Sequence, residues 1–139
     1  MSKASKIIDK MFLNDPFSQW LGIKRIEEKE GAVVLELTVR KEMLNGFGIA
    51  HGGITYSLAD SALAFSANGY GIQSVSIETS ISHTKSVKEG DVLRTKVTEE
   101  SLTSKIGIYT IHIYNQANVN VALFKGTVYR TGKEWEVER

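Results

Sequence analysis

The chain has 139 residues, 42% hydrophobic and 24% charged, with a formal net charge of +1 and no cysteine. These values fit one globular domain spanning residues 1–139. They exclude disulfides, thiolate metal sites and a cysteine nucleophile, and the balanced charge argues against a nucleic-acid partner. No segment has the apolar length of a membrane span or a signal-peptide core, so we expect a cytoplasmic protein with no membrane partner.

Short helices are predicted within the N-terminal segment, residues 1–20. The first, Lys3–Phe12, has apolar residues at helical spacing. In the second, Asp15 suits the N-cap, Pro16 the first helical position and Gly22 the position after the end. Its apolar residues are expected to pack as a lid over a larger structure: Phe17, Trp20 and Leu21.

The rest of the chain reads as strands around one helix. The helix, Gly53–Asn68, is small or apolar on every face, which is typical of a buried helix. Residues 41–48 are expected to be irregular, and the polar tail, 131–139, to fray. The predicted strands cover residues 23–28, 32–39, 74–84, 92–99, 106–115 and 119–130. We therefore expect an α+β fold in which a sheet wraps one long helix and oligomerisation covers its exposed face and edges.

A glycine-rich loop, Asn45–Gly53, opens directly into the predicted central helix. The first N–H groups of a helix lack internal partners and carry the positive end of its dipole. Glycine at 52 lets a ligand approach them, so this place can stabilise an oxyanion. Asp60 lies about 12 Å further along the helix. That is too far to act on the same carbonyl within one chain, but a two-fold dimer would remove the difficulty.

Alternatives remain open at each of these residues. Asp60 is either a general base with a pKa raised by burial or a structural hydrogen-bond acceptor. Asn45 alone could be a turn residue, and His51 alone could fix the loop. Partners for a histidine metal site are missing at usable spacing, so no metal is expected. Nucleotide hydrolysis is disfavoured because no Gly-Lys-Ser/Thr follows the loop glycines.

One stretch resembles the signature of hotdog-fold acyl-CoA thioesterases, in particular the phenylacetate-pathway (PaaI-like) subgroup. The matching residues are Asn45, Gly48, His51-Gly-Gly53, Leu58-Ala-Asp60 and Ala67-Asn68. The resemblance runs from about residue 20 to residue 131 and includes the Glu89-Gly-Asp91 turn. The Thr84-Lys-Ser86 turn departs from it, because it lacks the proline common there.

The resemblance implies catalytic roles for five residues. Asp60 matches the helix carboxylate that activates water or attacks the thioester, and Gly52 the N–H that polarises the carbonyl. Asn45 matches the amide that orients water or substrate, and Ser76 a hydroxyl that assists in positioning the water. His51 belongs to the same motif. In these families the carboxylate comes from one protomer and the loop from the other.

The resemblance also implies where coenzyme A lies. The loop residues Phe47 and Gly53 would contact the substrate, and the pantetheine would pass the strand start at Lys105, Ile106 and Gly107. Candidates for phosphate contacts are Lys85, Lys88 and Lys125, each of which could equally be a solvated surface charge. The acyl group, aryl or medium-chain, would meet some of Phe47, Ile49, Tyr56, Leu63 and Phe65.

The expected function is hydrolysis of an acyl-CoA thioester, with no cofactor other than the coenzyme A of the substrate. The expected assembly is a dimer that shares its active sites, paired again into a tetramer. Two alternatives remain: a non-catalytic acyl-CoA-binding hotdog protein, and a structural module in which Asp60 is merely a satisfied buried group.

Overall fold

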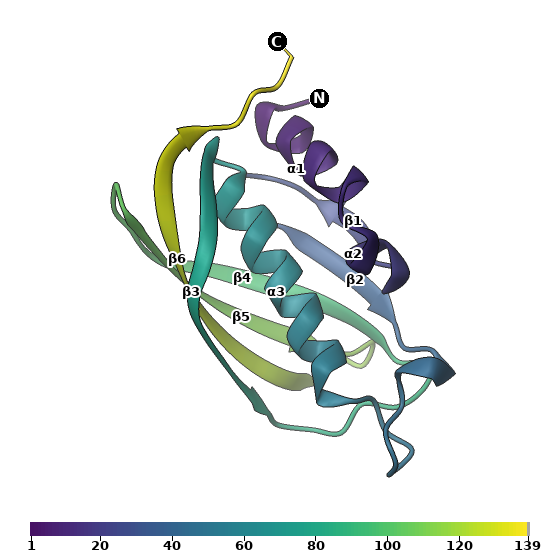
Figure 1. The fold of residues 1–139 in the computed structure, drawn as a ribbon. Helices are drawn as coiled ribbons and strands as arrows, with labels where there is room; N and C mark the ends of the chain where they lie inside the picture. Colours follow the sequence, from purple (N-terminus) through teal and green to yellow (C-terminus); the bar gives the residue numbers. More distant parts are fainter. Residues whose placement is uncertain (139) are drawn as a thin grey trace.

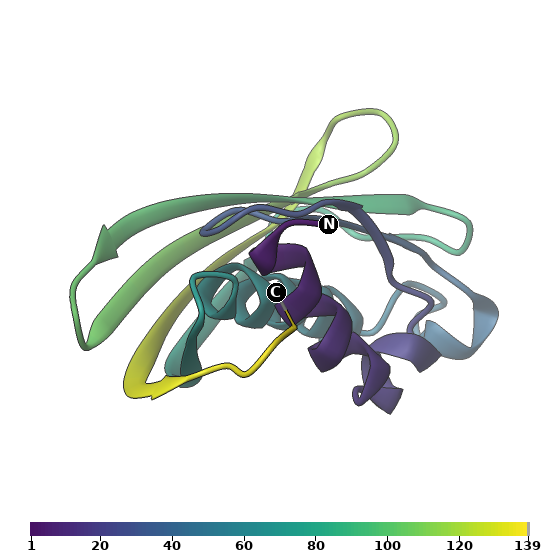
Figure 2. The ribbon, with the colours of Figure 1, turned by 90° about the horizontal axis from the view of Figure 1, so that it is seen from above.

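The computed structural model describes residues 1–138 and contains one six-stranded antiparallel sheet curved around a long helix, α3 (Figure 1). The strand order is β1-β2-β4-β5-β6-β3. The strands are β1 (Lys24–Glu27), β2 (Val34–Thr38), β3 (Ile72–His83), β4 (Val92–Leu102), β5 (Ile106–Tyr114) and β6 (Asn120–Glu134). The helices are α1 (Lys3–Leu13), α2 (Pro16–Trp20), the short 3-10 helix η1 (Lys41–Met43) and α3 (Gly52–Asn68). Figure 2 shows α1 and α3 on the same face of the sheet. The predicted fold class is confirmed.

The central helix α3 is buried on most of its circumference, as its composition predicts. Leu58, Ala59 and Ala62 are fully buried, and Leu63 and Phe65 are 1% exposed. An apolar helix of this kind is stable only when other elements cover every side. Strands β2 to β6 and the helices α1 and α2 all contact it. The fold therefore holds both ends of α3 in fixed positions relative to the sheet.

The second N-terminal helix, α2, is capped as predicted but does not form an apolar lid. Asp15 accepts a hydrogen bond from the Ser18 N–H at 3.0 Å. Leu21 is buried, but Phe17 and Trp20 are 53% and 50% exposed. The two rings stack on each other at the surface. The lid prediction is therefore wrong for these two residues, because α2 buries its Ser18 and Leu21 side and leaves Phe17 and Trp20 on its exposed side.

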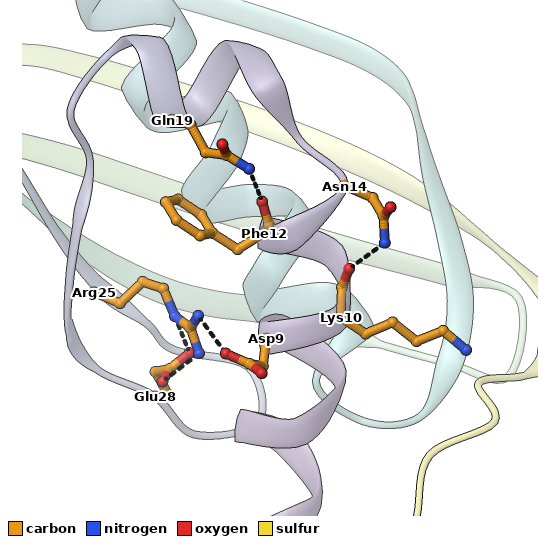
Figure 3. A network of polar contacts seen from close by, with 7 residues as sticks. All are labelled: Asp9, Lys10, Phe12, Asn14, Gln19, Arg25 and Glu28. Atoms are coloured by element: carbon orange, nitrogen blue, oxygen red, sulfur yellow. Dashed lines mark hydrogen bonds and ion pairs between the residues drawn. The ribbon is translucent and has the colours of Figure 1, made fainter.

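Polar contacts tie α1 to β1 (Figure 3). The Arg25 guanidinium makes a two-pronged hydrogen bond to Glu28, with both distances 3.0 Å, and a third bond to Asp9 at 3.1 Å. The guanidinium also lies over the Phe12 ring, 5.5 Å from its centroid. Phe12 in turn packs edge-on against Phe65 of α3. These contacts fix the position of α1 beside the central helix.

The polar tail is more ordered than its composition predicts. Strand β6 continues to Glu134, four residues beyond the predicted end. Beyond it, the Trp135 N–H donates to the Gly71 carbonyl at 2.8 Å. The side chain of Lys10 reaches the Glu136 carbonyl at 3.0 Å. The expected fraying of residues 131–139 is therefore wrong from Thr131 to Glu134, because pairing with β3 and contacts to α1 replace water as hydrogen-bond partners.

The long strand β3 forms one edge of the sheet. Two of its apolar side chains, Val75 and Ile77, are 57% and 59% exposed. Its pairing with β6 shifts register between Ser76 and Glu78, so a bulge lies within the strand. An unpaired edge of this length is a template for association with another chain.

Within residues 1–138, no helix combines the length and apolar character needed to cross a bilayer.

Candidate active site

The N-terminus of α3 presents one backbone donor that the protein leaves free. His51 is the N-cap, and its Nδ1 accepts the Gly53 N–H at 3.1 Å. The Ile54 N–H donates to the His51 carbonyl. The Gly52 N–H has no acceptor among residues 1–138. His51 therefore organises the helix start, the predicted substrate contact at Gly53 has its N–H occupied, and Gly52 supplies the available donor.

Asn45 both shapes the loop before α3 and keeps part of its side chain free. Its Oδ1 accepts the Phe47 N–H at 2.9 Å, and its backbone carbonyl accepts the Gly48 N–H at 3.0 Å. Among residues 1–138, no acceptor is bonded to the side-chain amide nitrogen. The structure thus combines the two interpretations of Asn45, a turn residue and a side chain able to donate to a ligand. Phe47, at the tip of this loop, is 90% exposed.

A cavity of about 370 Å³ lies beside this helix start. It brings together three of the predicted site residues, Asn45, Gly52 and Lys85. Its remaining lining residues are Ile49, Ala50, Thr55, His83, Thr84, Ser86 and Val87. We call this space the loop cavity. A free backbone N–H, a side-chain amide and a lysine in one cavity form a place suited to an anionic or carbonyl oxygen.

His83, at the end of β3, is a residue of the loop cavity that the sequence analysis missed. Thr55 Oγ1 donates to the Gly52 carbonyl at 3.1 Å and lies 3.2 Å from His83 Nδ1. Because a hydroxyl has one proton, this pair of bonds makes His83 Nδ1 the donor to Thr55 and leaves Nε2 available. A methyl group on Gly52 would lie 3.1 Å from that Nε2. No local pattern marks His83, since only the packing of β3 against α3 brings it there.

Asp60 and Ser76 line a second, separate cavity of about 480 Å³. We call it the helix cavity, because it extends along α3. Burial raises the pKa of the Asp60 carboxyl, and the nearby negative charge of Asp15 raises it further. The carboxylate accepts no hydrogen bond from residues 1–138. A half-buried carboxylate without a protein donor is unlike a structural acceptor, whose hydrogen bonds are usually satisfied.

The charge of Asp15 is held near Asp60 by contacts between α2 and α3. Ser18 donates its hydroxyl proton to Asp15 at 2.6 Å, and the hydroxyls of Ser18 and Ser61 are 2.8 Å apart. Ser18 is 1% exposed. The N-terminal helices therefore affect the electrostatics of the helix cavity, a link that no local sequence pattern indicates.

The remaining predicted substrate contacts line neither cavity in the part of the chain that the structure describes. Lys88 is exposed in the turn before β4, and Lys125 is exposed on β6, where it pairs with Glu78. Lys105 is exposed in the turn before β5, and Ile106 and the buried Gly107 begin that strand.

The predicted acyl contacts are dispersed. Leu63 lines the helix cavity, and Ile49 lines the loop cavity. Phe65 belongs to the core. The hydroxyls of Tyr56 and Thr79 are hydrogen-bonded to each other.

Comparison with known families and proteins gives the class of the protein. Residues 47–122 match the model of the Thioesterase superfamily, and the chain belongs to this family. It is 38% identical over 130 residues to a putative esterase of Archaeoglobus fulgidus, covering 94% of this chain and 84% of the relative. It is 37% identical over 122 residues to the acyl-coenzyme A thioesterase PaaI of Escherichia coli, covering 88% of this chain and 87% of the relative.

The solved structures agree with this assignment. The structure of Escherichia coli PaaI, from the phenylacetic acid degradation operon, superimposes with a TM-score of 0.92 at 36% identity. The match covers 95% of this chain and 96% of that chain, so it includes the N-terminal helices as well as the sheet and α3. The chain is thus a hotdog-fold thioesterase of the PaaI-like subgroup.

Proposed function

We propose that this protein hydrolyses the thioester of an aryl- or medium-chain acyl-CoA in an active site shared by two subunits. The thioester carbonyl accepts a hydrogen bond from the Gly52 N–H of one subunit. The partner subunit's Asp60 takes a proton from water, which attacks the carbonyl carbon, while Asn45 and Ser76 hold the geometry. Coenzyme A then leaves as the thiolate. This reaction needs no cofactor beyond the coenzyme A of the substrate.

The observation that carries the proposal is the division of the site residues between two cavities on one helix. The loop cavity has the free Gly52 N–H, and the helix cavity has the carboxylate with the raised pKa. Neither cavity alone holds both the Gly52 N–H and the Asp60 carboxylate. A two-fold axis that places the helix cavity of one subunit against the loop cavity of the other would complete two identical sites.

The environment of Asp60 supports its role as base. A carboxylate of raised pKa that accepts no hydrogen bond from residues 1–138 can accept a proton from water. Hydrolysis by water needs no nucleophile from the chain, which lacks cysteine.

Related proteins support an acyl-CoA substrate. A Streptococcus mutans protein, 26% identical with a TM-score of 0.78, was solved with bound acetyl-CoA. A Streptococcus pneumoniae protein described as a hypothetical thioesterase, 27% identical with a TM-score of 0.77, was solved with coenzyme A. Solved variants of the pneumococcal protein replace by alanine an aspartate and a threonine sixteen residues apart. Asp60 and Ser76 have the same separation.

The edge strand β3 supports the proposed dimer. Its unpaired edge and its exposed Val75 and Ile77 give a surface that a second copy could cover. The same strand carries Ser76, so association through β3 would bring the partner close to the helix cavity. Pairing of two such dimers into a tetramer remains part of the proposal.

The test is release of free thiol from a panel of aryl- and alkyl-CoA thioesters. We expect wild-type protein to release thiol and Asp60→Asn to lose about 10²–10⁴-fold in kcat/KM, because the base is removed while the shape is kept. Glu100→Gln is the control, since it makes the same chemical change at an exposed position on β4. Full activity in a folded Asp60→Asn variant would contradict the role of Asp60. Binding of acyl-CoA without thiol release by wild type would favour the non-catalytic alternative, and absence of both would favour the structural module.

A further inference from the structure

The helix cavity has a reactive end and a distal end. Four of its lining residues follow one face of α3, at positions i, i+3, i+4 and i+8: Asp60, Leu63, Ala64 and Asn68. Between the first and last of these the helix advances about 12 Å. The cavity is therefore an elongated space that begins beside the Asp60 carboxylate and ends where α3 ends.

Apolar side chains from four elements and the tail form much of its wall. They are Met11 of α1, Leu63 of α3, Val75 of β3, Val128 of β6 and Trp135 after β6. The volume of about 480 Å³ lies within the usual range for sites that bind small molecules. Walls of this kind favour a hydrocarbon group, since burying apolar surface is favourable without any specific polar partner.

The tail residue Trp135 is held firmly at the distal end. Its backbone N–H donates to the Gly71 carbonyl and its indole N–H to Asn68 Oδ1, both at 2.8 Å. Asn68 also accepts the Ser74 N–H and donates to the carbonyls of Ala64 and Ser74. The Asn68 amide is therefore fully used within the protein and offers nothing to a polar group at the distal end.

We propose that Trp135 sets the upper length of the acyl group. The helix cavity takes an acyl group that is apolar at its far end, and the indole stops any group that extends past Asn68. This inference rests on the proposed function for the identity of the ligand. Because Trp135 is fixed by two hydrogen bonds to the end of α3 and its following turn, it acts as a rigid stop and not as a yielding one.

The test uses a series of non-hydrolysable alkyl-CoA thioethers from ethyl to dodecyl, with dissociation constants measured by calorimetry. We expect the affinity of wild type to rise with chain length up to a limit and then to fall. In Trp135→Ala the limit moves to longer chains, and analogues beyond the wild-type limit bind about 10-fold tighter or more. Trp135→Phe has a smaller ring without the N–H that bonds Asn68, so we expect a limit between those of wild type and Trp135→Ala. Trp20→Ala is the matched control, because Trp20 is half exposed on α2 and lines neither cavity among the described residues.

A second variant tests whether the acyl group lies in the helix cavity, even if Trp135→Ala fails to fold. Ala64→Leu adds three carbon atoms part-way along the cavity, and leucine ranks just below alanine as a helix former. We expect it to lower the length limit, with the loss of affinity greatest for the longest analogues. An unchanged limit in Ala64→Leu and in every folded Trp135 variant would overturn the inference.

The outcomes separate this inference from the proposed function. If wild type hydrolyses acyl-CoA thioesters but the limit does not move in the variants, only the length stop is wrong. If the limit moves but no thioester is hydrolysed, the length stop stands and the proposed hydrolysis is wrong. If wild type binds none of the analogues, both are overturned.

Discussion

Gly52 and Asp60 are on the same helix, but the two residues contribute chemically opposite groups. Gly52 offers a backbone donor at the positive end of the helix dipole, and Asp60 a carboxylate that burial and Asp15 make a stronger base. His51 makes the free Gly52 donor possible, because it accepts the Gly53 N–H and so fixes the start of the helix at residue 52. The predicted contribution of each residue therefore depends on where it stands along α3.

A proline at position 52 isolates the contribution of the backbone donor. Proline removes the N–H, and its fixed φ suits the first position of a helix. We expect Gly52→Pro to lower kcat about 10²–10³-fold, measured by thiol release. Gly52→Ala is the matched control, since it keeps the N–H and places the same Cβ 3.1 Å from His83 Nε2. Equal losses in the two variants would mean that crowding against His83, and not the donor, is what matters.

The charge of Asp15 is expected to move the pH dependence of the reaction. A base must be ionised to act, so a raised pKa at Asp60 places the acidic limb of kcat/KM at higher pH. Asp15→Asn removes the repelling charge but keeps an oxygen for the Ser18 N–H. The pKa of Asp60 then falls, and the limb should move to lower pH.

The control for this pH shift is Asp9→Asn. Asp9 is a residue of α1, and Arg25 of β1 balances its charge. A limb that stays in place in Asp15→Asn, or that moves equally in both variants, would contradict the coupling of Asp15 to Asp60.

At the level of helices and strands, the sequence predicts those features that depend on residues close together in the chain. The Asp15-Pro16 start of α2 and the apolar circumference of α3 identify these helices before any tertiary contact is known. The end of β6 and the place of Trp135 could not be predicted, because both depend on partners distant in sequence, β3 and Gly71. The 12 Å offset along α3 predicts a site shared by two chains, and this stays a prediction.

The Arg25 contacts that dock α1 should contribute measurably to stability. Arg25 and Glu28 are only 17% and 16% exposed in their side chains, whereas Lys125 and Glu78 are 52% and 67% exposed. Glu28→Gln removes the charge from the two-pronged bond, and we expect a loss of about 1–2 kcal/mol in the free energy of unfolding. Glu78→Gln, the same change in an exposed pair, should cost less than about 0.5 kcal/mol. Urea unfolding measures both, and equal costs would show that the Arg25–Glu28 pair, which holds the guanidinium in place for Asp9 of α1, adds nothing beyond a surface pair.

For the whole molecule, charge and size acquire a more specific meaning. A net charge of +1 provides no general attraction for an anionic ligand, so the phosphates of coenzyme A would depend on local lysines such as Lys85 at the loop cavity. The proposed site residues lie in two separate cavities, so under the proposed function one chain would provide two halves of a site, and the edge strand β3 would provide the surface through which two chains join them.

Subunit mixing tests the shared site most directly. Asp60→Asn and Gly52→Pro each inactivate a different half, and a mixed dimer regains one intact site from Gly52 of one chain and the partner subunit's Asp60. After equal amounts are refolded together, random pairing should restore about one quarter of wild-type thiol release. If the mixture releases no more thiol than the two separate variants, each active site lies within a single chain and the shared-site proposal is wrong.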